Sequence, residues 1–392
     1  MSFDVLVSFL KPYLRYICES HLDLTNNIMF LKKIPLLIFF LLISVISTSQ
    51  NKVKTYLYAG RVEKLQNDNV ILIGTASSVS FNFTGNKCEI SLQSVDSWEH
   101  HNYVSLVLDG KYIGKIRIEK GEAQSFPIKI TSNKKVHNLT VYKTTEAHSG
   151  GILFTGTTAK LTSISAQKKK KIEFIGDSIT CGAASDPSDI PCDKGEYFDH
   201  HNGYYAYGPV LSRAIGVDYL MSSVSGIGIY RNWNDENKDE AIMPDVYQNL
   251  YLTKDASKPK YDFAFQPDII SIALGTNDFS GGDGKKERLP FNPEKYISNY
   301  VNFIKMLYEH NPKAQIVITN SPMVGGDRGI VFEECLNKVK NAFAEDKKHK
   351  SILIFKFKPM TPKGCGGHPD VADHKVLANE YAPFLKKLLN EK

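Results

Sequence analysis

The spacing of apolar residues changes once along this chain, and that change limits the possible folds more than any other feature. Over residues 53–167, apolar and polar residues alternate, as at Val79, Phe81 and Phe83. A period of two places one face of each strand on a core and the other in solvent. Asp109-Gly110 lies between two such runs and predicts a hairpin turn. Several short strands of this kind predict a jelly-roll-like β-sandwich over residues 53–167.

From residue 172 to residue 392, short continuous apolar runs alternate with helical stretches. Runs of this length suit strands buried on both faces, and the stretches between them place apolar residues on one helical face. Asn292 and Pro293 begin one helix, as cap and first-turn residue. This order predicts a three-layer α/β/α domain with a parallel sheet. The expected strands are Ile172–Ile175, Val217–Val224, Ile269–Leu274, Gln315–Thr319 and Ile352–Phe357.

Residues 1–50 have the pattern of a targeting segment. Lys32 and Lys33 precede an apolar run from Ile34 to Ser47, and small or polar residues follow it. A basic flank, an apolar core and a small-residue exit are typical of a secretory signal, placed here at about residues 29–50 after an upstream extension. The run is short for a membrane span, and no stop-transfer pattern follows it; a short anchor helix is the alternative. We expect an exported protein, periplasmic or extracellular, with no stable membrane span after signal removal.

The charge balance gives little reason to expect a nucleic-acid partner. The 48 Lys and Arg against 42 Asp and Glu leave a net charge of +6, spread along the chain. The densest basic run, Lys168–Lys171, separates the two predicted domains. We interpret it as a solvated junction before a buried strand, the alternative being a patch for an anionic surface.

Five cysteines follow the targeting segment, at positions 88, 181, 192, 335 and 365. An odd number leaves at least one thiol unpaired within the chain. Cys181 and Cys192 are close enough in sequence to bridge. Pairing depends on geometry that a sequence does not show, so this pair is a candidate only.

Polar blocks follow the first three strands of the predicted parallel sheet, where sites of such sheets lie. Gly176-Asp177-Ser178 follows the first strand and can present the serine hydroxyl. Ser225-Gly226-Ile227-Gly228 follows the second, and its glycines let backbone N–H groups approach a ligand. Gly275-Thr276-Asn277-Asp278 follows the third, where the Asn277 amide can donate to a developing oxyanion and Asp278 can brace the loop. Each block by itself is also compatible with an ordinary turn or cap.

A fourth block lies just before the final helix, from Gly366 to His374. His368, in the loop, is a candidate general base for Ser178. His374 is the alternative base. We expect no metal, because the six-residue spacing of the two histidines does not suit a pair of ligands on a helix.

The four blocks together, in this order, resemble those of SGNH (GDSL-type) hydrolases. They are GDSIT, the Gly226 block, GTND and the late His-Pro. The longer segments GYYAYGPVLSRAI, SGIGIYRN, GTNDFS and HPDVADH resemble carbohydrate esterase family two, whose members are acetyl esterases with a β-sandwich before the SGNH domain. The resemblance extends from about Tyr56 to the C-terminus.

The resemblance implies a role for each block. Ser178 is expected to be the nucleophile and His368 its base, with the N–H groups of Ser178 and Gly226 and the Asn277 amide as the oxyanion hole. No cofactor is implied. SGNH enzymes usually carry an Asp two or three residues before the histidine, where this chain has Gly366 and Cys365. We therefore expect a Ser-His dyad with a main-chain carbonyl in place of the carboxylate.

The expected substrate is an acetylated polysaccharide or oligosaccharide, such as acetylxylan or acetylmannan. Tyr230, Arg231 and Trp233 follow the Gly226 block and are candidate sugar contacts. The alternative is core packing for Tyr230 and a surface loop for the others. Two other functions remain open: an SGNH esterase or lipase for other acyl esters, and a non-catalytic glycan-binding protein.

Overall fold

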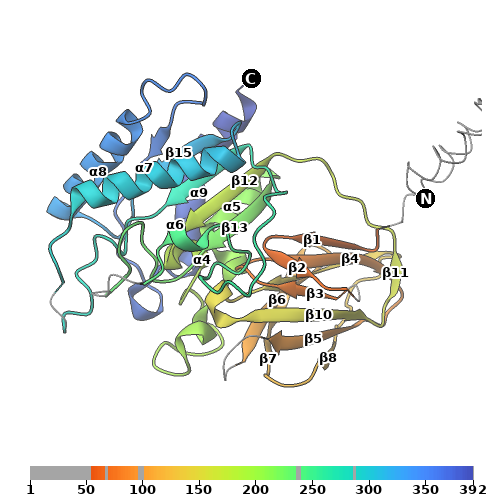
Figure 1. Ribbon diagram of the computed structural model, residues 1–392. Helices are drawn as coiled ribbons and strands as arrows, with labels where there is room; N and C mark the ends of the chain where they lie inside the picture. Colours follow the sequence, from red (N-terminus) through yellow and green to blue (C-terminus); the bar gives the residue numbers. More distant parts are fainter. Residues whose placement is uncertain (1–53, 67–68, 96–100, 235–239, 286–287, 392) are drawn as a thin grey trace, which may run out of the picture. The chain divides into compact units, whose positions relative to one another are not determined.

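The alternating segment folds into two antiparallel sheets that face each other (Figure 1). Within the residues that the structure describes, one sheet has the order β1-β4-β9-β6-β7, with β11 beside β4, and the other the order β2-β3-β10-β5-β8. The sandwich expected from the sequence is confirmed. The strands are β1 (Tyr56–Ala59), β2 (Val62–Lys64), β3 (Val70–Leu72), β4 (Ser78–Thr84), β5 (Glu89–Val95), β6 (Asn102–Leu108), β7 (Lys111–Ile118), β8 (Gln124–Pro127), β9 (His137–Lys143), β10 (Gly151–Thr157) and β11 (Lys160–Thr162).

This computed structural model describes residues 54–66, 69–95, 101–234, 240–285 and 288–391. The expected targeting segment and upstream extension lie outside the described residues. In the described ranges, we find no helix with the length and apolar character needed to cross a membrane.

The core of the sandwich follows the period of two. Phe81 and Phe83 on β4 and Leu92 on β5 have no exposed surface, and neither has Val141 on β9. The predicted hairpin at Asp109-Gly110 joins β6 to β7, with positive φ angles of 54° and 83°. Alternation therefore determined both which side chains enter the core and where the chain reverses.

The second half of the chain forms a parallel sheet with the order β13-β12-β14-β15-β16, covered by helices on both faces (Figure 1). Helices α7 and α8 pack on one face and α5 and α9 on the other, each pair around its own apolar core. The three-layer architecture is thus confirmed. The elements are β12 (Lys171–Gly176), α4 (Ser178–Cys181), α5 (Tyr207–Ile215), β13 (Asp218–Ser223), α6 (Met243–Val246), β14 (Ile269–Ala273), α7 (Pro293–His310), β15 (Gln315–Thr319), α8 (Gly326–Asn341), β16 (Leu353–Phe355) and α9 (Val371–Asn390). Short 3₁₀ helices are η1 (Ala147–Ser149), η2 (Tyr197–His200), η3 (Gly203–Tyr205) and η4 (Cys365–Gly367).

The strand order sets the position of the site. β12 lies between β13 and β14, and the chain leaves it first toward one neighbour and later toward the other. Loops after such strands diverge at the carboxyl edge and leave a crevice there. The polar blocks after β12, β13 and β14 all meet at this edge.

A buried arginine joins the sandwich to the α/β domain. Arg61, in the β1–β2 turn, has no exposed surface. Its guanidinium donates to Ser222 Oγ at 3.1 Å and to the carbonyl oxygens of Asn249 and Tyr247 at 2.8 and 3.0 Å. Glu173 on β12 is buried nearby and accepts hydrogen bonds from Ser222 and Tyr247. Because a buried charge needs partners, these contacts hold the two domains together.

The cysteine pairing differs from the candidate suggested by sequence proximity. Cys192 is bonded to Cys365 and not to Cys181. Cys181 lies in α4 with no exposed surface, and its Sγ faces Ser223 Oγ at 3.2 Å, so it is not available to the loop that carries Cys192. Among the described residues, Cys88, Cys181 and Cys335 are free and buried, which agrees with the odd number of cysteines.

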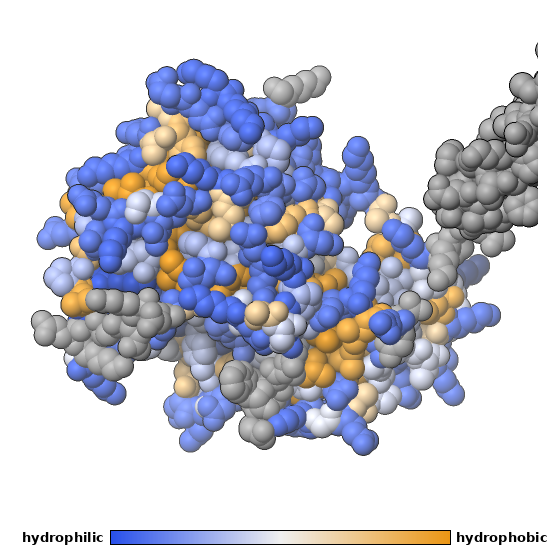
Figure 2. All heavy atoms as spheres, in the orientation of Figure 1, coloured by the Kyte–Doolittle hydropathy of each residue, from blue (hydrophilic) through white to orange (hydrophobic). Residues whose placement is uncertain are grey.

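The face shown in Figure 2 carries mainly hydrophilic side chains, interrupted by small apolar patches. The large apolar side chains with the greatest exposure include Leu289, Ile330 and Val376. Scattered exposure of this kind is normal for a folded protein.

Candidate active site

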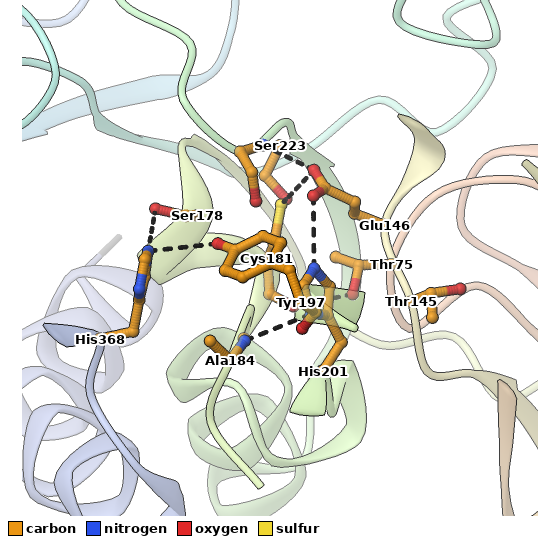
Figure 3. Close-up of polar contacts among 12 residues, drawn as sticks. Thr75, Thr145, Glu146, Ser178, Cys181, Ala184, Tyr197, His201, Ser223 and His368 are labelled. Carbon is orange, nitrogen blue, oxygen red and sulfur yellow. Dashed lines mark hydrogen bonds and ion pairs between the residues drawn. The ribbon is translucent and has the colours of Figure 1, made fainter. Parts of the chain in front are cut away.

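Ser178 and His368 meet at the carboxyl edge of the parallel sheet. Ser178 is the first residue of α4, directly after β12, and the Asp177 side chain caps that helix by accepting the Ile179 N–H. His368 follows η4, just before α9. Ser178 Oγ lies 3.0 Å from His368 Nε2 (Figure 3). This is the distance at which a serine hydroxyl can donate its proton to an imidazole.

The other ring nitrogen of His368 faces main chain. Nδ1 makes no hydrogen bond of good geometry within the described part of the chain. Burial lowers the pKa of His368 and the nearby His201 lowers it further, while the carbonyl groups of Cys365 and Gly366 oppose this shift. The imidazole of His368 therefore stays neutral at a lower pH than that of an ordinary histidine, and in this form it can accept a proton.

The two aspartates after His368 do not take the place of the missing acid. Asp370 and Asp373 form a capping box at the start of α9: Asp373 N–H donates to Asp370 Oδ1 at 2.7 Å, and Asp370 N–H to Asp373 Oδ2 at 3.2 Å. Asp373 also accepts the Lys363 N–H. Both carboxylates are thus engaged by the backbone around the helix end.

The structure brings His368, and not His374, to the nucleophile. His374 lies on α9 with no exposed surface, and its Nδ1 accepts the Tyr207 N–H at 3.3 Å. Burial lowers the pKa of His374 to about 3. This arrangement makes His374 a neutral histidine of the core.

The loop after β13 lies beside the Asn277 amide. Gly226 has a φ of +75°, a conformation that glycine adopts without strain. Asn277 Nδ2 donates to the Ile227 carbonyl oxygen at 2.8 Å, which places the amide next to the Gly226 backbone. Glycine is required at position 228 for a steric reason, because a Cβ there would collide with the Arg231 carbonyl oxygen. The candidate oxyanion donors, from Ser178, Gly226 and Asn277, therefore come from three neighbouring strand ends.

Asp278 braces this loop, as the sequence suggested. Its fully buried carboxylate accepts N–H groups from Ile229 at 3.0 Å, Tyr230 at 2.9 Å and Arg231 at 3.2 Å. Burial raises its pKa to about 6, against the lowering effect of these hydrogen bonds.

The candidate sugar contacts divide into two kinds. Tyr230 packs its ring against Phe291, and its hydroxyl accepts the Asn292 N–H at 3.0 Å. Arg231 donates to the carbonyl oxygens of Asp278 and Leu289 at 2.8 and 2.6 Å. These contacts favour the alternatives to sugar binding: packing for Tyr230 and a role within the loop for Arg231.

Trp233 is different. Its side chain is 49% exposed and borders an open groove of about 240 Å³ next to Gly226. His148, from η1 of the sandwich, and Glu240 line the same groove. An indole in this position offers a flat apolar face beside the Gly226 loop.

Two residues at the site were not found by sequence reasoning. Tyr197, from η2, lies with its hydroxyl 3.3 Å from His368 Nε2 (Figure 3). Glu146, from the segment between β9 and η1, lies behind the oxyanion loop, where its carboxylate accepts the Ser225 N–H at 2.6 Å. Neither belongs to a motif or a periodic pattern. In the described ranges, no cluster of three or more His, Cys, Asp or Glu side chains could hold a metal ion.

Comparison with known protein families agrees with this geometry. Residues 58–166 match the family described as carbohydrate esterase 2 N-terminal, and residues 174–375 match the GDSL-like lipase/acylhydrolase family. An acetylxylan esterase/glucomannan deacetylase of Cellvibrio japonicus is 31% identical over 288 residues, covering 72% of this chain and 77% of the relative. The chain belongs to carbohydrate esterase family two. As such it is a carboxylic ester hydrolase of the SGNH type.

Two further similar proteins match most of this esterase's length. The cellulase/esterase CelE of Acetivibrio thermocellus is 26% identical over 349 residues, which are 85% of this chain and 39% of that protein. The solved structure of an acetyl xylan esterase from the rumen bacterium Butyrivibrio proteoclasticus superimposes with a TM-score of 0.71 at 25% identity, covering 86% of this esterase and 97% of the other. Family two therefore accounts for both the sandwich and the α/β domain.

Proposed function

We propose that this esterase is exported and removes O-acetyl groups from polysaccharides or oligosaccharides through an acetyl-serine intermediate. The observation that carries the proposal is the 3.0 Å contact between Ser178 Oγ and His368 Nε2, beside the Gly226 loop and the Asn277 amide. Relatives named acetylxylan esterase/glucomannan deacetylase support the substrate class.

The reaction begins at Ser178. Its Oγ attacks the acetyl carbonyl carbon while His368 Nε2 takes the hydroxyl proton. Negative charge develops on the carbonyl oxygen, which the N–H groups of Ser178 and Gly226 and the Asn277 amide stabilise. When the bond to the sugar oxygen breaks, His368 returns the proton to that oxygen and the deacetylated glycan leaves.

Water completes the cycle. His368 takes a proton from the water that attacks the acetyl-serine, the second tetrahedral intermediate forms in the same oxyanion hole, and acetate leaves as Ser178 recovers its proton. His368 works here without a carboxylate partner, as a Ser-His dyad. The carbonyl groups of Cys365 and Gly366, which raise the pKa of His368 against the effect of burial, support this assignment.

The groove beside Trp233 supports a carbohydrate substrate. It is open, lies next to the oxyanion loop and has polar as well as aromatic walls, which suits a hydroxyl-rich ring. Export is supported by the basic and apolar pattern at residues 32–47 and by the Cys192–Cys365 disulfide, a bond that persists in oxidising compartments. Mass spectrometry of the mature protein purified from culture medium or periplasm tests that part directly.

The experiment that tests the activity is acetate release from acetylated xylan, glucomannan and cello-oligosaccharides, compared with hydrolysis of long-chain acyl esters. Release of acetate that Ser178→Ala abolishes supports the proposal. Preference for long-chain esters indicates a lipase-like enzyme instead. Glycan binding with no turnover, unchanged in Ser178→Ala, indicates a binding protein.

A further inference from the structure

A buried carboxylate of the sandwich lies behind the catalytic residues of the α/β domain. Glu146 follows β9, and only 4% of its surface is exposed. Burial by itself raises the pKa of Glu146, but His201, His148 and the hydrogen bond to Ser225 outweigh it and lower the pKa to about 2. Glu146 therefore stays an anion to lower pH than an ordinary glutamate.

One side of this carboxylate holds the oxyanion loop. Glu146 Oε2 accepts the Ser225 N–H at 2.6 Å and the Cys181 thiol at 3.5 Å. Ser225 directly precedes Gly226, whose N–H is a proposed oxyanion donor. A charge-assisted bond of this kind fixes the backbone at the start of the loop.

The other carboxylate oxygen, Oε1, is connected to the general base His368 through contacts of His201 and Tyr197. His201 Nε2 lies 3.4 Å from Glu146 Oε1, and its ring meets the edge of the Tyr197 ring with centroids 4.7 Å apart (Figure 3). The Tyr197 hydroxyl contacts His368 Nε2 at 3.3 Å. A second link runs through Ala184, whose N–H faces His201 Nδ1 and whose carbonyl oxygen accepts the Cys365 N–H at 2.9 Å.

The position of Glu146 is itself held from the sandwich. Lys143 Nζ is fully buried and donates to the carbonyl oxygens of Thr145 and Glu146 at 2.9 and 2.6 Å, and to Thr145 Oγ1 at 3.0 Å. These bonds fix the backbone at Thr145 and Glu146, while the Glu146 carboxylate contacts His201 and Ser225 of the α/β domain.

We propose that Glu146 is a positioning residue for deacetylation, which holds the oxyanion loop through Ser225 and the general base through His201 and Tyr197. This proposal rests on the proposed function, because it assigns Ser225 and His368 to neighbouring parts of one catalytic site. By this proposal, a residue of the sandwich contributes to catalysis in the α/β domain.

The test compares Glu146→Gln with Glu173→Gln. Both replace a buried carboxylate at the junction of the domains by an amide of the same shape, but the Glu173 side chain contacts Ser222 and Tyr247 and neither loop of the site. We expect Glu146→Gln to lower kcat about 10- to 100-fold with KM changed less than about twofold. In Glu173→Gln we expect a lower Tm and an unchanged kcat.

The pKa of His368 gives a second readout that needs no turnover. The groups that face His368 are Ser178, Tyr197, His201, Glu146 and, from α9, His374. Glu146 raises the pKa of His368 and His201 lowers it. An NMR titration should therefore show a lower pKa of His368 in Glu146→Gln and a higher one in His201→Asn, while Glu173→Gln resembles the parent.

The outcomes separate the two proposals. Equal kcat and equal His368 titration in parent and Glu146→Gln overturn the positioning role, as does a loss of kcat that Glu173→Gln reproduces. A parent that releases no acetate overturns the proposed function, and the opposite pKa shifts then still decide whether Glu146 acts on His368. If Glu146→Gln does not fold, His201→Asn decides the branch to the base by the same titration.

Discussion

Cys192 and Cys365 are bonded to each other across 173 residues of sequence, and the bond joins the segment before η2 to the turn that carries His368. Tyr197 and His368, which touch at the site, are thus both within five residues of the disulfide. Cys365 also occupies a position where SGNH relatives carry an acidic residue. A covalent bond therefore constrains the turn that carries His368.

We expect the double variant Cys192→Ser/Cys365→Ser to lose both stability and kcat. Opening a loop of this length costs about 5 kcal/mol of unfolding free energy in the chain-entropy view, and the freed turn lets His368 leave its contact with Ser178. Urea unfolding and acetate release measure the two effects. Cys335→Ala, which removes a free buried cysteine, serves as the control and should keep its kcat. An unchanged kcat in the double variant would show that the disulfide serves folding alone.

His368→Ala is expected to abolish turnover, whereas His374→Asn is expected to keep it. Only His368 contacts Ser178 Oγ, while His374 is buried against the Tyr207 N–H. Initial rates with 4-nitrophenyl acetate check both variants. Near-normal activity of His368→Ala would contradict the assignment of the base.

Acid should destabilise the fold through His374. Its pKa is lowered to about 3 in the folded protein by burial, below the ordinary value of 6.5, so the unfolded chain binds the proton more tightly. The stability present above pH 6.5 is therefore lost as pH falls from 6.5 toward 3, by up to roughly 1.4 kcal/mol per pH unit. Urea unfolding at pH 7 and pH 5 measures the slope, and His374→Asn should reduce it. An equal slope in that variant would assign the acid sensitivity to other groups.

Asn277→Ala should lower kcat by about 10²–10³, since one of the proposed oxyanion donors is lost while substrate binding in the ground state is little affected. Steady-state kinetics on acetylated xylo-oligosaccharides separate kcat from KM. If the variant raises KM alone, Asn277 contacts the bound substrate and not the transition state.

Trp233→Ala should raise KM for acetylated glycans about five- to tenfold, because the groove loses its exposed ring face. The substitution keeps the backbone N–H of residue 233, which donates to the Gly226 carbonyl oxygen at 2.7 Å. Tyr230→Phe is the matched control: the ring remains against Phe291, so KM should not change. Equal KM values in Trp233→Ala and the parent would move the sugar site elsewhere.

Three of the residues that sequence reasoning placed at the site come from segments that follow strands. Ser178, Gly226 and Asn277 each come within three residues of the end of an apolar run, and parallel strands in one sheet bring their carboxyl ends to one edge. Local pattern and one topological rule were enough to bring these three together. The bracing role of Asp278 followed from the same placement.

The contacts missed by the sequence depend on how separate segments dock. Glu146 belongs to the sandwich by its position in the chain, and nothing in its neighbourhood marks it as part of another domain's site. Cys181 and Cys192 are eleven positions apart, but α4 buries the first while the second lies on a loop. Proximity along the chain therefore predicted the wrong disulfide, because burial decides which thiols can meet.

Because of Arg61, we expect that the sandwich and the α/β domain of this esterase cannot be exchanged separately with those of related enzymes. Within the described residues, the Arg61 guanidinium donates to groups of the α/β domain, and its charge opposes the effect of burial, which raises the pKa of Glu173. A protein cut at the lysine run would expose both halves of this junction, and would leave Arg61 in the sandwich and Glu173 in the α/β domain without each other. Recombination that exchanges catalytic domains between such enzymes, in the laboratory or in evolution, must carry the sandwich along as a single inherited block.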